Sequence, residues 1–455
     1  MKQKIRLLKA CIFLIILLPM QGCEKYLDAK PDAKIAAPTS IEDVQLLLDN
    51  YTVMNISSPN LAMQSDDDFY LTDTYLNSLP AEFQQAYKWE QDVEGLVDWR
   101  AGYKMVLHSN MALETLQKIT ADDFNRAAIK SLTGSALFYR SLAFFHLAQH
   151  FAIPYDAAGA AALPGIPLRV SSDINTPNIR HSMQATYDSI IAGLQHALPM
   201  LPATAVRVSR PSKAAAYALL SNLYLNMRAY DKAGEYADSA LRLHEMLINY
   251  NSVSASAAVP FAQFNSEVIF GSAITGHRRF NLANGKVDSS LYDSYASNDL
   301  RKTLYYRASG SPGQYGFKGN YEGNTYGALF NGFTSAEMLL IKAEAAARAG
   351  QPTEAMEWLN RLLITRWKTG SFVPFTAADE GEALDIVLRE RRKELVGRGK
   401  RWYDLRRLNT EAGRATVLKR KTGGNEILLP PTSKRYTFLI PYQVVNETGM
   451  QQNER

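Results

Sequence analysis

Apolar residues recur every three or four positions along most of this chain, which is the spacing of one face of an α-helix. The pattern continues through long blocks with few glycines and prolines, and it gives way to polar, irregular stretches between them. It predicts a mainly α protein with helices over residues 41–54, 96–118, 124–151, 182–199, 211–227, 230–245, 335–349, 352–366 and from Leu384 to Leu395.

Two pairs of these helices resemble tetratricopeptide units. Residues 211–245 and 335–366 each give two short helices with small residues and tyrosines on the faces that would meet. Pro352 lies near the start of the last helix, a position that proline favours. The two copies are 122 residues apart, so we expect inserted structure to interrupt any stacking of the pairs.

The helical pattern fades between residues 246 and 334, where Gly, Ser, Asn and Tyr dominate. The segment 305–330 carries many aromatic rings among glycines and prolines and cannot form a regular helix. Its rings are therefore expected on loops or short strands. Taken together, the patterns predict a helix-pair scaffold with a loop-rich second subdomain that contains short strands.

The N-terminus has the form of a secretory signal peptide over residues 1–22, with a basic start and an apolar run from Cys11 to Met20. That run is too short to span a bilayer as a helix. Gly22 directly precedes Cys23, as in a bacterial lipoprotein signal, so Cys23 is the expected lipidation site. The alternative is an ordinary signal peptide followed by an incidental thiol.

The stretch from 385 to 409 alternates acidic and basic residues on a helical pattern, and Gly397 and Gly399 are expected to end its first helix. Glu390, Glu394 and Asp404 could be read as catalytic acids. Carboxylates among so many arginines more often form ion pairs at helix ends and on surfaces. We therefore expect a structural role.

The overall charge gives no support for nucleic-acid binding. The formal net charge is +5, but four of the 50 basic residues lie in residues 1–22, which contain no acid. The remainder holds 46 basic and 45 acidic residues. Nucleic acid is therefore not an expected partner.

Two groups of residues raise the question of a metal. Asp66, Asp67 and Asp68 are consecutive but lack the loop spacing of a calcium site, so a capping or solvated loop is the better interpretation. His146 and His150 have ligand spacing on a helix without a third ligand beside them. No metal and no cofactor is expected.

Residues 390–407 closely resemble the C-terminal signature of the SusD/RagB family, which has the form E-R-R-x-E-L-x-G-x-G-x-R-W-x-D-L-R-R. This chain departs from the common form at Arg398, where the family often has Glu. Weaker similarities run from the start Cys23–Asp28 to the closing residues 438–453. The resemblance implies three parts, a lipoprotein signal over 1–22, a SusD-like region over 23–245 and a RagB/SusD region over 246–455.

The resemblance also implies a function, since the sequence shows no enzyme motif of its own. SusD-like proteins are non-catalytic lipoproteins that bind oligosaccharides at the outer membrane and act with a SusC-like TonB-dependent transporter. Two alternatives remain open: a RagB-like peptide binder of the same uptake system, and a tetratricopeptide-type adaptor with no small ligand. Candidate ligand contacts, chosen by region and residue type, are Asp67, Tyr70, Tyr75, Asn77, Tyr292, Tyr295, Tyr306 and Tyr315.

Overall fold

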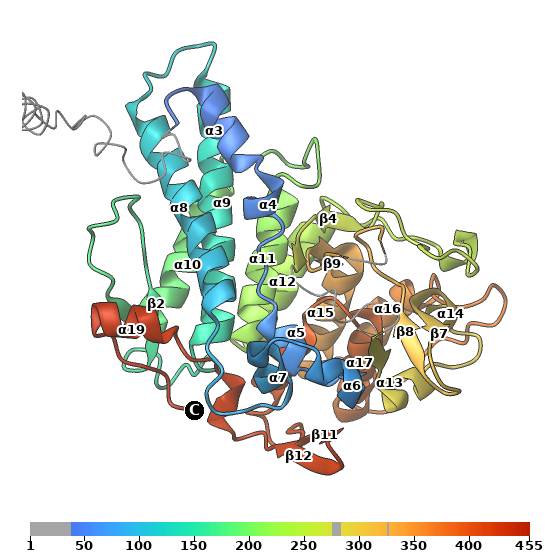
Figure 1. Cartoon of the computed structure of the whole chain (residues 1–455). Coiled ribbons are helices and arrows are strands. Elements are labelled where there is room, and N and C mark those ends of the chain that lie inside the picture. Colours follow the sequence, from blue (N-terminus) through green and yellow to red (C-terminus); the bar gives the residue numbers. More distant parts are fainter. Residues whose placement is uncertain (1–37, 275–283, 325–326) are drawn as a thin grey trace, which may run out of the picture. The chain divides into compact units, whose positions relative to one another are not determined.

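Three long helices carry the N-terminal part of the chain: α8 (Leu96–Lys118), α9 (Arg126–Phe151) and α10 (Met183–Ala197). The computed structural model describes residues 38–274, 284–324 and 327–455. The predicted signal peptide and Cys23 lie outside these residues. Helices α8 and α10 both pack against α9, whose C-terminal half is buried on every side (Figure 1).

The predicted helix over 41–54 is interrupted. The structure has α3 (Ile41–Leu48) and α4 (Tyr51–Met54), with Asp49 and Asn50 between them. The side chain of Asn50 accepts a hydrogen bond from the backbone of Val53 and so starts a new helix. Asp and Asn compete with the helical backbone in this way, and they favour caps over helix interiors.

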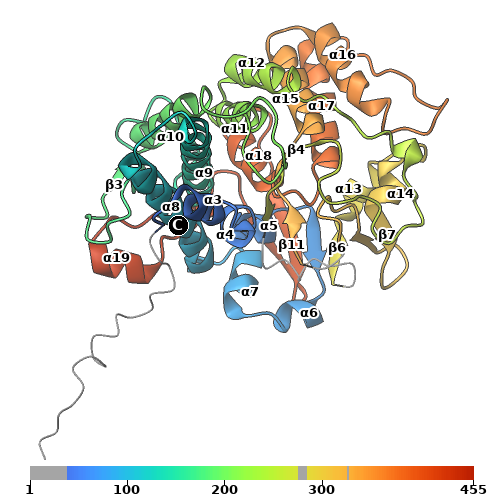
Figure 2. The same cartoon turned by 90° about the horizontal axis from the view of Figure 1, so that it is seen from above.

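The two predicted helix pairs are confirmed as α11 (Lys213–Asn226) with α12 (Tyr230–Leu241), and α15 (Ser335–Arg348) with α16 (Pro352–Leu363). The expectation that inserted structure separates them is wrong. Helix α15 packs directly on α12, as Figure 2 shows, and Gly234 permits the close approach because a Cβ there would lie 2.8 Å from that of Ala345.

The inserted segment leaves this stack after His244 and returns to it at Ser335, and these two residues are in contact. We call this contact the neck. Ser335, the first residue of α15, donates a hydrogen bond from its hydroxyl to the carbonyl of His244, just past the end of α12. The His244 ring in turn meets the carbonyl of Ser266 at 2.9 Å. The segment between 244 and 335 therefore begins and ends at one point of the scaffold.

Short strands dominate the described part of the insertion and its surroundings, and each described sheet has two strands. The antiparallel pairs are β1 (Phe69–Leu71) with β6 (Gly285–Val287), β2 (Pro164–Pro167) with β3 (Arg180–Ser182), β4 (Val268–Phe270) with β10 (Phe333–Thr334), β5 (Ala273–Ile274) with β9 (Leu329–Phe330), β7 (Tyr306–Ala308) with β8 (Tyr315–Phe317), and β11 (Leu418–Thr422) with β12 (Asn425–Leu429). Short helices lie among them: α5 (Leu61–Ser65), α6 (Asp73–Asn77), α7 (Ala81–Tyr87), α13 (Ser289–Asp293), α14 (Arg301–Tyr305) and α19 (Tyr442–Thr448).

Helix α17 (Glu380–Glu394) contains the first five residues of the signature segment, and most of the charged side chains there are buried, not on the surface as expected. Glu390 and Glu394 are buried and meet two buried guanidinium groups from elsewhere in the chain. Arg301 lies 2.5 Å from Glu390 and 3.3 Å from Glu394, while Arg366 lies 2.8 Å from Glu394. Ion pairing was correctly predicted, but it joins the insertion to the helix scaffold in the interior.

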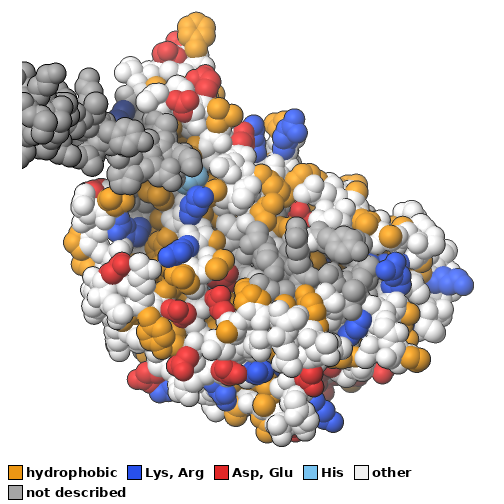
Figure 3. All heavy atoms as spheres, in the orientation of Figure 1, with side chains coloured by type: hydrophobic (Ala, Val, Ile, Leu, Met, Phe, Trp, Pro, Cys, Tyr) orange, Lys and Arg blue, Asp and Glu red, His pale blue; other side chains and the backbone are white. Residues whose placement is uncertain are grey.

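After α17 the chain turns through Gly397 and Gly399, which both have positive φ, before α18 (Arg401–Leu408) begins. Residues 39–455 form a single compact unit, and no helix among the described residues is long and apolar enough to cross a membrane. On the face shown in Figure 3, acidic, basic and apolar side chains are interspersed.

Candidate functional site

The β11–β12 hairpin covers a cavity of about 600 Å³, which we call the hairpin pocket. Glycines 423 and 424 both have positive φ and form its tight turn, as two-residue hairpin turns require. The pocket is lined by Asp67, Phe69, Tyr70, Tyr87, Asp288, Ser289, Ser290, Arg392, Val417, Leu418, Lys419, Arg420 and Lys421.

Arg420 fixes the hairpin to the rest of the protein. Its side chain is buried and donates hydrogen bonds to the backbone carbonyls of Gln64, Asp66 and Tyr87. Its guanidinium also lies over the rings of Tyr87 and Trp89, at 3.9 and 4.6 Å from their centroids. The pocket wall is therefore held in place before any ligand arrives.

Of the three consecutive aspartates, Asp67 lines the pocket. Asp66 is the C-cap residue of α5, which agrees with the capping interpretation, but the stretch is not a solvated loop. Asp66 and Asp68 are buried, and Asp67 receives two hydrogen bonds from Arg401 at 2.6 and 2.9 Å. Burial acts to raise the pKa of Asp67, but Arg401 and Arg392 outweigh it and hold that pKa below its usual range. Burial raises the pKa of Asp68 to about 6.

Two of the predicted contact residues, Asp67 and Tyr70, line this pocket, and Tyr292 and Tyr315 lie outside its lining. Tyr70 lies on the outer side of β1, between buried Phe69 and Leu71, and its hydroxyl is hydrogen-bonded to Gln314. Tyr315 follows Gln314 on β8 and stacks on Tyr292 of α13, with centroids 3.6 Å apart and planes 12° apart. Asp67 and Tyr70 therefore give the pocket a carboxylate and an aromatic ring, and the Tyr292–Tyr315 stack is not part of its lining.

The other four predicted residues are placed differently. Tyr295 and Tyr306 are buried, and their hydroxyls meet each other at 3.0 Å. Tyr75 and Asn77 lie on α6 outside the pocket lining, although Asp73 of the same helix accepts hydrogen bonds from Thr422 and Gly423 at the hairpin tip. That any of these four touches a ligand stays a prediction.

The hairpin itself was missed by the sequence analysis. Its signal is the Gly423-Gly424 pair between two short runs, but no alternation of polar and apolar residues accompanies it in the sequence. Burial does alternate in β11, with Leu418 and Arg420 inside and Lys419 and Lys421 exposed.

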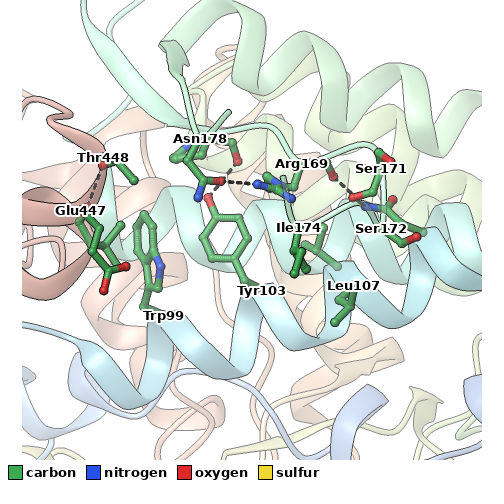
Figure 4. Close-up of a pocket in the computed structure, with 14 residues that line it drawn as sticks. Trp99, Tyr103, Leu107, Arg169, Ser171, Ser172, Ile174, Asn178, Glu447 and Thr448 are labelled. Carbon is green, nitrogen blue, oxygen red and sulfur yellow. Dashed lines mark hydrogen bonds between the residues drawn. The ribbon is translucent and has the colours of Figure 1, made fainter. Parts of the chain in front are cut away.

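A second cavity, which we call the helix groove, lies between α8, residues 167–178 and α19 and has a volume of about 300 Å³. Figure 4 shows Trp99, Tyr103 and Leu107 in a row along α8, beneath the loop. The Trp99 and Tyr103 rings lie 4.7 Å apart. This groove was also not predicted.

Many of the polar groups in the helix groove already bind other parts of the protein. The Tyr103 hydroxyl donates to the carbonyl of Pro167 at 2.8 Å, and Arg169 donates to Asn178, Thr176 and Asp173. Glu114 accepts hydrogen bonds from Ser171 and Ser172. These bonds brace the loop and leave fewer groups for a ligand than the hairpin pocket offers, so we take the hairpin pocket as the candidate binding site.

The geometry does not support a metal site at the three aspartates or at His146 and His150. Arginine groups surround the three aspartates, and His146 Nδ1 meets the hydroxyl of Tyr403 at 3.3 Å. Among the residues that the structure describes, no three His, Cys, Asp or Glu side chains are arranged to hold a metal ion.

A scaffold of stacked helix pairs with a braced pocket in its loop-rich part defines the class of this protein, and comparisons identify the family. A profile described as "Starch-binding associating with outer membrane" matches residues 25–225, and a profile described as "SusD family" matches residues 265–452. The chain belongs to the SusD/RagB family, and the resemblance found in the sequence is confirmed.

Individual relatives agree with this assignment. The chain is 25% identical to SusD-like protein P2 of Formosa agariphila over 388 residues, which cover 70% of this chain and 72% of the relative. A SusD superfamily protein of Bacteroides thetaiotaomicron superposes with a TM-score of 0.74 at 21% identity, covering 91% of this chain and all of the other. Surface glycan-binding protein A of Bacteroides uniformis gives a TM-score of 0.71 at 17% identity, with coverage of 91% and 100%. These structural likenesses show a shared fold.

Proposed function

We propose that this protein is a non-catalytic, lipid-anchored binding protein of the outer membrane that captures oligosaccharides in the hairpin pocket. One observation carries the proposal: Asp67 and Tyr70 line one braced cavity of about 600 Å³ together with Arg392 and Arg420, which are distant from them in sequence. Sugar rings have apolar faces that pack on aromatic rings, and hydroxyls that pair with polar side chains. Family membership supports the same function.

Anchoring through Cys23 would hold the binding unit at the membrane while leaving it in water. Two or more acyl chains anchor a protein stably, whereas one does not. At the outer face of the outer membrane, the bound oligosaccharide would pass to a SusC-like TonB-dependent transporter. That partner is proposed from the family.

Calorimetry on the full-length protein, purified in detergent, tests the binding step. The ligands are a panel of oligosaccharides and, for the RagB-like alternative, a panel of peptides. We expect oligosaccharide binding that weakens about tenfold in Tyr70→Ala, because a stacked ring contributes on the order of 1 kcal/mol or more. Tyr103→Phe in the helix groove is the matched control and is expected to bind like the wild type.

Each other result has a definite meaning. Binding of peptides alone would replace the oligosaccharide proposal with the RagB-like alternative. Binding of neither panel, with a transporter recovered after cross-linking in the membrane, would favour the adaptor. Release of shorter sugars by the purified protein would contradict a non-catalytic function.

A further inference from the structure

The hairpin pocket continues into a second cavity of about 300 Å³, which we call the side pocket. The two cavities share Ser290 and Arg392 as lining residues. The side pocket has Arg389, Arg401 and Arg414 among its other lining residues, and no acidic residue lines it within the described chain. A ligand long enough to leave the hairpin pocket on this side would pass along a row of positive charges.

Several of these cations already form ion pairs with acidic side chains of the protein. Arg401 and Arg392 bind Asp67, Arg392 also binds Asp68 at 3.0 Å, and Arg414 pairs with Asp385. The acid on the pocket wall, Asp288, lies 3.9 Å from Arg392 and accepts hydrogen bonds from Ser290 and Leu291. These groups balance one another.

Three exposed cations remain after this pairing: Arg389, Lys419 and Lys421. None of them makes an ion pair with a described residue. Lys419 and Lys421 both line the hairpin pocket and lie on the same face of β11, about 7 Å apart along the strand. In the strand register of the hairpin, Glu426 lies opposite Lys421 without forming an ion pair, and Leu428 lies opposite Lys419.

We propose that the ligand is an acidic oligosaccharide, one whose sugar units carry carboxylate or sulfate groups. This inference rests on the proposed function and names the substrate class of the same pocket. Tyr70 would pack against a sugar ring, while Lys419, Lys421 and Arg389 would meet successive negative charges. A neutral oligosaccharide would leave these three cations without partners.

Calorimetry with defined probes tests the charge requirement: oligogalacturonate for carboxylates, sulfated oligosaccharides for sulfates, neutral β-glucan oligomers, and polyglutamate as an acidic peptide. We expect at least one of the two acidic sugar classes to bind tightly and to weaken as salt rises from about 0.05 to about 0.5 M, because added ions screen the attraction. The class that binds identifies the charged group. The double variant Lys419→Gln/Lys421→Gln is expected to bind it about tenfold more weakly.

The control Lys130→Gln/Lys368→Gln removes two exposed charges elsewhere and is expected to bind like the wild type. Equal thermal midpoints for both variants would show that any loss comes from binding. Neutral sugars binding better than acidic ones would overturn this inference and leave the proposed function intact, whereas failure of every sugar would overturn both. Polyglutamate binding as tightly as the acidic sugars, or a double variant that binds like the wild type, would also overturn it.

Discussion

Replacing Glu394 by glutamine tests whether the buried charges of the signature segment hold the two parts of the chain together. Glutamine has nearly the same shape as glutamate, so the change removes a charge without opening a cavity. Glu394 accepts hydrogen bonds from Arg301 and from the Nε and Nη2 atoms of Arg366, the closest at 2.8 Å. Burial acts to raise its pKa, but Arg366 and Arg301 outweigh burial and lower it.

The expected cost follows from the surroundings. Arg301, Arg366, Glu390 and Glu394 are all buried to 2% exposure or less, so water cannot replace the lost partner. Removing one member of a buried ion pair typically costs about 3 to 5 kcal/mol, because it leaves an uncompensated charge in the interior. Arg366 keeps Glu267 and Arg301 keeps Asp299, so the cost expected here is at the lower end of that range, about 3 kcal/mol. That is a large fraction of the roughly 5 to 15 kcal/mol by which proteins are stable.

Urea unfolding followed by tryptophan fluorescence measures this cost, with Glu245→Gln as the control. Glu245 pairs with Arg361 at 3.2 Å, but both side chains are about half exposed or more, at 65% and 48%. An exposed pair contributes about 1 kcal/mol or less. If Glu394→Gln lowered the free energy of unfolding by no more than the control does, the account of the network as an interior link would be refuted.

Three further predictions concern the backbone, the pH dependence and the anchor. Gly399→Ala is expected to cost more stability than Gly413→Ala. Both glycines have positive φ, but a Cβ at Gly399 would lie 2.6 Å from Ile274. Equal melting temperatures of the two variants would contradict this. Burial raises the pKa of Glu322 from 4.5 to about 7, so the folded protein keeps a proton there that the unfolded chain releases. The stability from this group is therefore present below about pH 4.5 and lost as the pH rises to about 7. Glu322→Gln should gain up to about 3 kcal/mol over the wild type at pH 8 and little at pH 4.5, whereas the same difference at both values would exclude this cause. Labelled palmitate should enter the wild type but not Cys23→Ser, and label in both would place the lipid elsewhere.

The long helices were predictable from sequence because each depends on a local period. The spans of α8 and α9 agree with prediction within two residues, since apolar residues recur on one face of each. Where a local competitor intervenes, as at Asn50, the periodicity alone does not show the break.

The charged interior was not predictable in the same way. Charged residues of a helix are normally placed on its exposed side, and the partners that override this rule for Glu394 are 28 and 93 residues distant. The bond between Arg401 and the Asp67 carboxylate was not predictable for a similar reason, because the two residues are 334 positions apart. Residue type and region selected Asp67 and Tyr70, which line the hairpin pocket, but they could not distinguish such residues from buried rings such as Tyr295.

The neck between His244 and Ser335 has a consequence for how this architecture can vary. Because the segment leaves and rejoins the helix stack at one hydrogen-bonded point, a longer or shorter segment needs only to close the same short gap, and loop closure depends weakly on length. The helices α12 and α15 already contact each other without it. A recombinant chain that keeps these two helices and exchanges the residues between them, together with their partners on α17 and at Arg366, would keep the stack and change only the side of the hairpin pocket that Asp288, Ser289 and Ser290 form.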